Sequence, residues 1–281
     1  MTHAATSSAP AGPADDYFDP SEFSIRADLE DTHYWHLNRR EVLLDALKAA
    51  CPDRAARLVE VGCGIGTVAS HLNANGLNVD YAEVHQAGLD IARERAIARM
   101  GTDFAQQRSF LKLDVLAEPV PCTYDGILMF DVLEHLPDPR LALENLRQGL
   151  ANAPGAFVLL TVPAFQFLWS PWDDIEKHKC RYTTKSLRAL ADAAGFDVSR
   201  STYFFSALFF AALGVKGLRR GRALLKPPEK AASISDLAES KSIAVVNRLA
   251  LAALKPELSW LRKGDLPFGT SLLAVLKPRQ R

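Results

Sequence analysis

The feature that most constrains the fold is a glycine-rich turn between an apolar segment and a helical one. Residues 59–66 are Val-Glu-Val-Gly-Cys-Gly-Ile-Gly, with glycine at every second position from Gly62 to Gly66. Glycine adopts positive φ angles and lets the backbone approach a ligand closely. The N–H groups at the start of the following helix have no partners within that helix. A strand that runs into this turn therefore predicts a ligand-binding loop, although the glycine pattern alone is weakly specific.

Two acidic residues strengthen this interpretation because each lies at the end of a later predicted strand. Glu83 follows the turn by roughly 20 residues, the spacing of a ribose-binding acid in nucleoside-binding folds, and Asp114 ends the next strand. A carboxylate at Glu83 can accept both hydroxyl hydrogens of a ribose, and Asp114 can accept an N–H from an adenine amino group. The alternative is that the glycines only permit tight packing and that both acids are ordinary surface residues.

Apolar segments alternate with helical patterns along the 281 residues. Strands are expected at 57–62, 77–84, 110–115, within 124–133, 155–163, 196–205 and 268–278, and helices at 27–50, 67–76, 87–100, 138–150 and 183–194. This alternation predicts an α/β fold, a Rossmann-like three-layer sandwich with a mostly parallel seven-stranded sheet. We also expect an antiparallel edge strand and a helical insertion before the last strand.

The chain is expected to divide into a disordered tail at 1–24, a helical cap at 25–56, a ligand-binding core at 57–205, a helical insertion at 206–267, and a final strand and tail at 268–281. The first segment is rich in small residues and proline and lacks the basic start and apolar stretch of a secretory signal.

Composition excludes several classes of protein. The chain has 33 basic and 33 acidic residues and a formal net charge of zero, so no nucleic acid partner is expected. Its four cysteines form no CxxC pair, and His33 and His36 are not accompanied by further ligands, so we expect no metal. A cytoplasmic location is expected. The sequence does not indicate an oligomeric state.

These motifs together resemble those of the class I S-adenosylmethionine-dependent methyltransferases, in the subgroup that acts on small molecules or lipids. The matching residues are VEVGCGIG at 59–66, Glu83, Leu-Asp-Val at 113–115 and YDGILMFDVLEHLPDP at 124–139. The likeness runs from about Asp28 to Phe205, and the last strand also fits. The resemblance implies a transferase that binds S-adenosylmethionine, transfers its methyl group in line to an acceptor and releases S-adenosylhomocysteine.

The resemblance also implies a cofactor-binding set. Its members are Arg39, Glu60, Gly62, Cys63, Gly64, Gly66, Glu83, Val84, Asp114, Val115, Phe130 and Asp131. Glu83 would hold the ribose hydroxyls, Asp114 and the backbone of Val115 would hold adenine, and the glycines would leave room for methionine and ribose.

At the methionine end, the resemblance assigns Glu60 to the amino group and places Phe130 and Asp131 along the cofactor. An N-terminal helix would close over the cofactor, and either Arg39 or Arg40 could pair with the methionine carboxylate.

Two histidines are candidate general bases. His135 follows the fourth strand in the segment Phe-Asp-Val-Leu-Glu-His, and His178 lies in a cluster of aromatic and charged residues after the fifth strand. An imidazole can take a proton near neutral pH. The segment is not the Asn/Asp-Pro-Pro-Tyr/Phe sequence of enzymes that methylate exocyclic or amide nitrogens. The alternative is that both histidines only support nearby loops.

The insertion contains the main indication of the acceptor. The apolar run 203–215 is followed by Lys216, Arg219, Arg220, Arg222 and Lys226. The run is too short to span a bilayer, which needs about 20 apolar residues. Three alternatives stay open: a peripheral membrane contact through 203–226, a lid over a lipid-like acceptor, or packing against the sheet edge.

Other functions remain to be separated from methyl transfer. A non-catalytic member of the fold could keep the cofactor and bind a partner. Another enzyme on the same fold, such as an aminopropyl transferase or an NAD-dependent dehydrogenase, would also use a glycine turn. The dehydrogenase pattern places its third glycine at position 67, which is threonine here, and it has no use for Asp114.

Overall fold

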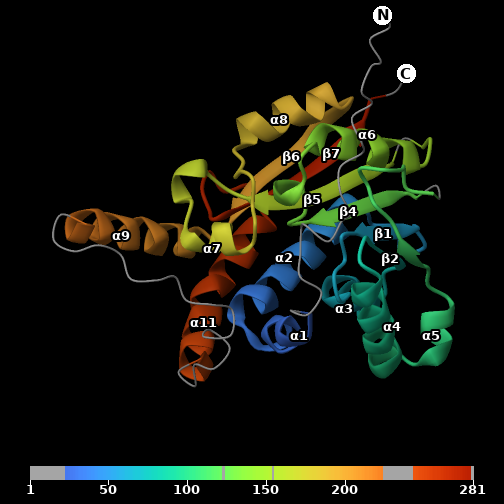
Figure 1. Ribbon diagram of the computed structural model, residues 1–281, viewed down its shortest axis with the longest axis horizontal. Coiled ribbons are helices and arrows are strands. Elements are labelled where there is room, and N and C mark those ends of the chain that lie inside the picture. The colour runs from blue at the N-terminus through green and yellow to red at the C-terminus, as the bar shows by residue number, and fades with distance from the viewer. Residues whose placement is uncertain (1–22, 122–123, 154, 224–242, 280–281) are drawn as a thin grey trace, which may run out of the picture.

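The computed structural model describes residues 23–121, 124–153, 155–223 and 243–279. Its centre is a sheet of seven strands in the order β3-β2-β1-β4-β5-β7-β6 (Figure 1). The strands are β1 (Leu58–Val61), β2 (Val79–Glu83), β3 (Phe110–Lys112), β4 (Gly126–Phe130), β5 (Phe157–Pro163), β6 (Phe196–Phe204) and β7 (Ser271–Pro278).

The first five strands pair in parallel, and β7 runs antiparallel between β5 and the edge strand β6. The predicted Rossmann-like architecture, with a mostly parallel sheet and antiparallel pairing at one edge, is thus confirmed. The switch of strand order between β1 and β4 places the carboxyl ends of both strands beside one crevice, where ligands bind in open α/β sheets.

Helices cover both faces of the sheet (Figure 1). They are α1 (Phe23–Thr32), α2 (Tyr34–Ala50), α3 (Thr67–Ala74), α4 (Gln86–Met100), α5 (Thr102–Gln106), α6 (Pro139–Gly149), α7 (Pro171–Ile175), α8 (Thr184–Ala193), α9 (Ser206–Ala223) and α11 (Ile243–Leu261). Helices α2, α3, α4 and α11 pack on one face, and α6 and α8 on the other.

Two hydrophobic cores lie on opposite faces of the sheet, and successive side chains along each strand alternate between them. In β1, Leu58 contributes to the core under α2 and α3, whereas its neighbour Val59 contributes to the core under α6 and α8. The same alternation places Leu128 and Met129 of β4 in opposite cores. Because successive side chains point to opposite faces, a strand that is buried on both sides reads as continuously apolar.

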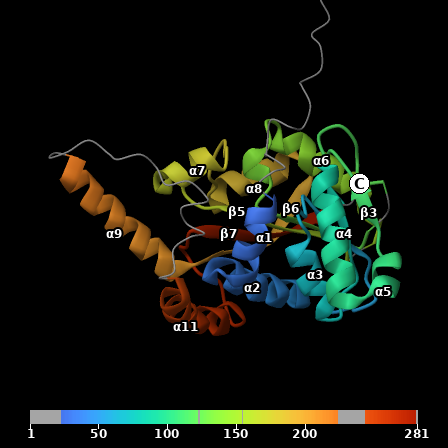
Figure 2. The same cartoon turned by 60° about the horizontal axis from the view of Figure 1, so that its bottom comes forward.

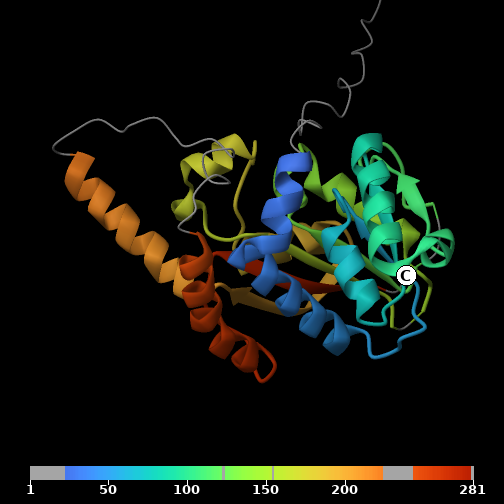
Figure 3. The same cartoon turned by 90° about the horizontal axis from the view of Figure 1, so that it is seen from below.

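The predicted helix at 27–50 is interrupted at His33, which differs from the sequence-based expectation. His33 has extended backbone angles and accepts a hydrogen bond from the backbone N–H of Trp35 through its side chain, as an N-cap residue of α2 does. The break separates α1 from α2, and α2 then runs along one face of the sheet, from the end of β4 near Arg39 toward the start of β1 (Figure 3).

The insertion contains two described helices, and residues 224–242 between them lie outside the described ranges. Helix α9 projects away from the body of the molecule (Figures 2 and 3). Its first residues are anchored by Glu257 of α11, whose carboxylate accepts the backbone N–H of Phe205 at 2.5 Å and that of Ser206 at 2.7 Å. Among the described helices, none combines the length and apolarity that crossing a membrane requires.

Candidate active site

The glycine turn after β1 has the positive φ angles that its sequence predicts. Gly62, Gly64 and Gly66 have φ angles of 74°, 55° and 73°, a region that side-chain-bearing residues rarely adopt. A Cβ at Gly62 would lie 2.4 Å from Val132, whereas a Cβ at Gly64 would meet no atom within 4 Å. The turn therefore packs tightly on one side and leaves open space above Gly64.

Glu83 at the end of β2 is joined directly to this turn. Its Oε2 accepts the backbone N–H of Gly64 at 2.8 Å, and its Oε1 accepts the N–H groups of Val84 at 2.9 Å and His85 at 3.1 Å. The residue is only 7% exposed. These bonds hold the carboxylate in one orientation beside the glycines.

Asp114, the other acid predicted at a strand end, lies next to Glu83. The backbone N–H of Leu113 donates to the carbonyl oxygen of Glu83 at 3.0 Å. Asp114, the next residue, therefore lies beside the carboxyl end of β2. Strand β3 ends at Lys112, earlier than expected, because the Asp114 side chain accepts the N–H of Leu116 in a turn. Val115, which follows it, is buried and is tied to α6 by Asn145.

Glu60 of β1 is buried beneath the first turn of α3. Its Oε2 has no hydrogen-bond partner among the described residues. Burial raises the pKa of Glu60 to about 8, and the nearby Arg39 guanidinium and Ala69 N–H lower it only in part. A buried carboxyl with an open oxygen is suited to accept a cationic or N–H-bearing group. The buried thiol of Cys63, in the turn itself, has its pKa raised by desolvation.

Helix α2 brings Arg39 to the end of β4. The Arg39 guanidinium lies 2.6 Å from Oδ2 of Asp131, and it stands over the rings of Trp35 and Phe130 at 5.2 Å and 5.9 Å. Asp131 has a φ of 55°, a conformation that is unusual for a non-glycine residue and clusters at functional sites.

The sequence left open whether Arg39 or Arg40 faces the site, and the geometry favours Arg39. Arg40 points instead to Asp31 of α1, at 3.7 Å. Trp35, which positions the guanidinium, was missed as a site residue, although it lies one helical turn before Arg39 on the same face of α2.

The two candidate bases lie together. The ring centroids of His135 and His178 are 4.8 Å apart with the planes at 76°. His178 Nδ1 lies 2.9 Å from Oδ1 of Asp173, a fully buried carboxylate that Arg181 also holds. Hydrogen bonds from both partners hold the pKa of Asp173 well below its usual range against the effect of burial.

Glu134 is a further member of this region that sequence reasoning did not select. It lies in the 3₁₀ turn η3 (Leu133–His135), is fully buried, and has its pKa raised well above the ordinary value by desolvation. Its neighbour His135 was selected on sequence. Spacing alone does not show that the turn directs the Glu134 side chain inward.

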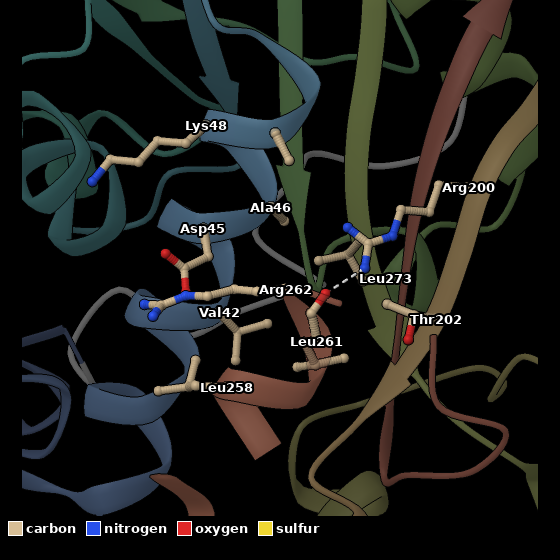
Figure 4. A pocket seen from close by; sticks show the side chains of 11 residues that line it. Val42, Asp45, Ala46, Lys48, Arg200, Thr202, Leu258, Leu261, Arg262 and Leu273 are labelled. Carbon is tan, nitrogen blue, oxygen red and sulfur yellow. Dashed lines mark hydrogen bonds and ion pairs between the residues drawn. The ribbon is translucent and has the colours of Figure 1, made fainter. Parts of the chain in front are cut away.

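A separate cavity of about 290 Å³ lies away from the predicted site, between α2, α11 and the β6–β7 edge (Figure 4). Both of its arginines are paired: Arg262 with Asp45 at 2.7 Å, and Arg200 with the carbonyl oxygen of Leu261 at 2.8 Å. It includes none of the residues that the sequence predicted to bind a cofactor.

The fold defines a Rossmann-like protein, and the strand-end cluster is its candidate ligand site. Residues 34–201, more than half of the chain, match the model of a family described as "Methyltransferase domain". The chain therefore belongs to this family, and the resemblance to the class I S-adenosylmethionine-dependent methyltransferases is confirmed.

Individual relatives agree with this assignment. The chain is 27% identical to the ubiquinone biosynthesis O-methyltransferase of Paracidovorax citrulli over 151 residues, which are 51% of this chain and 61% of that protein. A similar protein from Albidiferax ferrireducens is 25% identical over 165 residues, 52% of this chain and 64% of that one. The match thus spans about three fifths of the length of these relatives.

Solved structures show the same fold. Magnesium protoporphyrin IX methyltransferase from Synechocystis PCC 6803, with S-adenosylhomocysteine bound, superposes with a TM-score of 0.53 at 16% identity, covering 66% of this chain and 89% of that one. A phosphoethanolamine N-methyltransferase from Haemonchus contortus has a TM-score of 0.57 at 16% identity, covering 94% of this chain and 59% of that one.

Proposed function

We propose that this protein transfers the methyl group of S-adenosylmethionine to a small-molecule or lipid-like acceptor. The observation that carries the proposal is the hydrogen bond from the Gly64 N–H to the Glu83 carboxylate, with Asp114 beside it. Three successive strand ends thereby converge on one edge of the sheet, as a single nucleoside ligand requires.

The adenosine half of the cofactor fits this edge. The open space above Gly64 and the helix α3 N-terminus, which has no side-chain cap, leave room for a ligand against the turn. Oε1 of Glu83 already accepts two backbone N–H groups, whereas Oε2 accepts one and has a second acceptor position for a ribose hydroxyl. Asp114 and Val115 follow at the next strand end, where adenine would lie.

The methionine half fits the groups between β1, β4 and α2. Arg39 supplies a positive charge for a carboxylate, and the unpartnered Oε2 of Glu60 supplies an acceptor for an ammonium group. Because Arg39 is already bound to Asp131, a ligand carboxylate would share this guanidinium, whose five N–H donors allow more than one partner.

The chain's contribution to the chemistry is mainly positioning. The bound cofactor supplies a methyl group that its sulfonium already activates. The protein aligns an acceptor nucleophile with that methyl group and excludes water. His135 and His178 lie beyond Asp131 on the acceptor side and are the candidate bases for an oxygen acceptor. The relatives named as O-methyltransferases favour oxygen as the acceptor atom.

An aromatic cluster at the same edge supports an apolar acceptor. Its members are Phe165, Phe167, Tyr203, Phe209, Phe210 and Phe268. Phe165 stacks on Tyr203 at 4.7 Å, whereas Phe167 and Phe210 are 51% and 58% exposed. A half-open group of rings beside the site suits a lipid-like molecule that enters from an apolar phase.

The projecting helix α9 favours contact with a membrane surface. Its sequence carries Lys216 and Arg219, Arg220 and Arg222, and no acidic residue between 206 and 223. Exposed Phe210 and Leu213 precede these cations on the same helix. An apolar segment followed by cations matches the acyl and phosphate layers of an anionic bilayer. Our proposal is a cytoplasmic protein that binds the membrane peripherally through 203–226, and the charge pattern of α9 supports the membrane contact.

Incubation with radiolabelled S-adenosylmethionine and a total bacterial lipid extract tests this function. We expect label in the organic phase with the native protein and much less with the Glu83→Ala variant at a limiting cofactor concentration. Label that appears only with a water-soluble metabolite extract would reject the lipid-like acceptor, and label that is equal in both proteins would reject the cofactor site.

A further inference from the structure

Three polar side chains gather on the acceptor side of the predicted cofactor residues. Glu134 and His135 come from the turn after β4, and His178 comes from the loop after α7. One ligand atom of each lies within 4.8 Å of the others. Contrary to the expectation of no metal from the sequence, we propose that these three side chains form a binding site for one divalent transition-metal ion, and zinc is the ion used to test it.

Glu134 is the strongest reason to place a cation here. Its side chain is 0% exposed, and neither carboxylate oxygen has a hydrogen-bond partner in the described part of the chain. The nearby guanidinium groups are bound to other carboxylates. Arg39 pairs with Asp131 at 2.6 Å, and Arg181 pairs with Asp173 at 2.7 Å. A buried carboxylate is stable when a metal ion or another cation compensates it.

His178 has the support that metal-binding histidines usually have. Its Nδ1 lies 2.9 Å from Oδ1 of Asp173, which leaves Nε2 as the nitrogen for a metal. A ligating histidine commonly donates its other ring N–H to a carboxylate, which fixes the ring and raises its basicity. Asp173 is itself buried and accepts the backbone N–H of Ser170 at 2.8 Å, so the support is rigid.

The two chain segments that carry the ligands are held together. The backbone N–H of Lys179, next to His178, donates to the carbonyl oxygen of Glu134 at 2.7 Å. The Tyr182 hydroxyl donates to the carbonyl oxygen of Leu133 at 3.4 Å. Ligand atoms bound tetrahedrally at about 2.1 Å from a metal ion lie about 3.4 Å from one another. Side-chain rotations that move these ligand atoms by about an ångström would therefore bring them to bonding distance from one ion.

The donor set defines the class of metal. Two imidazoles with one carboxylate suit zinc, iron, cobalt or nickel better than magnesium or calcium, which prefer oxygen ligands. Three protein ligands leave a coordination position open. This step rests on the proposed function: the open position would bind the acceptor oxygen and lower its pKa, so that its proton would leave to solvent water and no histidine base would be needed.

Titration of the full-length protein with zinc tests the site. The protein is stripped with a chelator, dialysed and titrated with zinc chloride by calorimetry, and cobalt chloride is followed by visible absorption. We expect one ion per chain and cobalt bands of an imidazole-containing site. His178→Ala and Glu134→Gln should each weaken zinc binding by at least about tenfold, and Asp173→Asn by about 10- to 100-fold.

The matched control is His71→Ala. His71 lies on α3 and pairs with Glu41 at 3.3 Å, so its removal should leave the zinc affinity unchanged. Circular dichroism shows whether each variant is folded. If Glu134→Gln does not fold, the zinc affinity of Asp173→Asn is compared with that of the native protein instead. The proposal is overturned by absence of zinc binding, or by zinc binding that His178→Ala leaves unchanged.

A parallel titration with S-adenosylhomocysteine separates this proposal from the function on which it rests. Binding of S-adenosylhomocysteine without zinc binding overturns the metal site alone. Zinc binding without S-adenosylhomocysteine binding overturns the proposed methyl-transfer function and leaves a metal-binding protein.

Discussion

Oε2 of Glu83 accepts the backbone N–H of Gly64 at 2.8 Å. This bond links the end of β2 to the turn after β1, two segments that are separated by the whole of α3. A Cβ at Gly64 would meet no atom within 4 Å, so the turn stays open to a ligand beside this bond. The position of the proposed ribose site is therefore determined by the backbone of the turn as much as by the acid itself.

Replacement of Glu83 should weaken cofactor binding. Glu83→Ala removes the acceptor for the ribose hydroxyls and for three backbone N–H groups. We expect a loss of about 1–3 kcal/mol in the binding free energy of S-adenosylhomocysteine, measured by calorimetry. Glu94→Ala, at an exposed position on α4, is the control and should bind normally. Equal affinity of both variants would refute the ribose assignment.

Arg39 should act only on the amino-acid end of the cofactor. Arg39→Ala removes the guanidinium that lies against Asp131. We expect at least about tenfold weaker binding of S-adenosylhomocysteine, since a charge-assisted hydrogen bond contributes about 1.5–3 kcal/mol. Binding of methylthioadenosine, which has no amino acid part, should be unchanged. Arg40→Ala is the control, and a comparable loss for both ligands would show that Arg39 instead supports the fold.

Glu60 should make stability depend on pH. Its pKa is raised from an ordinary 4.5 to about 8 in the folded protein, so the folded state holds a proton that the unfolded state has released. The contribution of protonated Glu60 to the stability of the fold is fully present below the unfolded pKa, and it is lost as the pH rises toward 8. Between the unfolded and the folded pKa of Glu60, this group should lower the free energy of unfolding by about 1.4 kcal/mol per pH unit. Denaturant unfolding of Glu60→Gln should lack this slope, and an identical slope in both proteins would contradict the assignment.

The aromatic cluster and α9 should determine membrane binding. Phe210→Asp places a charge at a 58% exposed ring on α9, and we expect it to abolish flotation with vesicles that contain anionic lipid. Ile97→Asp, at a 38% exposed position on α4, is the matched control. Flotation that is insensitive to Phe210→Asp, or that the native protein lacks, would count against the membrane contact.

The sequence predicted the sheet and the glycine turn because both depend on local patterns. Continuous apolar runs such as 157–163 end at recognisable turns, and glycines with positive φ have few substitutes. Breaks within helical segments and very short helices were harder to predict. The break at His33 depends on a side-chain cap that competes with a helical pattern on both sides. The short helix α5 (Thr102–Gln106) has too few residues to show a period.

The candidate acceptor side was predicted only in part. His135 and His178 were selected separately, as alternatives, because nothing in their spacing shows that two loops bring them together. Glu134 was not selected, because the burial of its side chain depends on the 3₁₀ turn and on the loop around Lys179. The backbone N–H of Lys179 joins that loop to the turn through a hydrogen bond to the carbonyl oxygen of Glu134. Contacts between distant segments carry this information, and a single sequence contains little of it.

Titration of the native protein with S-adenosylmethionine, S-adenosylhomocysteine and NAD tests the central claim most directly. One site per chain for each of the two sulfur-containing nucleosides, and none for NAD, is the predicted result. Binding of NAD, or of neither sulfur compound, would contradict the assignment of the Gly64–Glu83–Asp114 edge to a methyl donor.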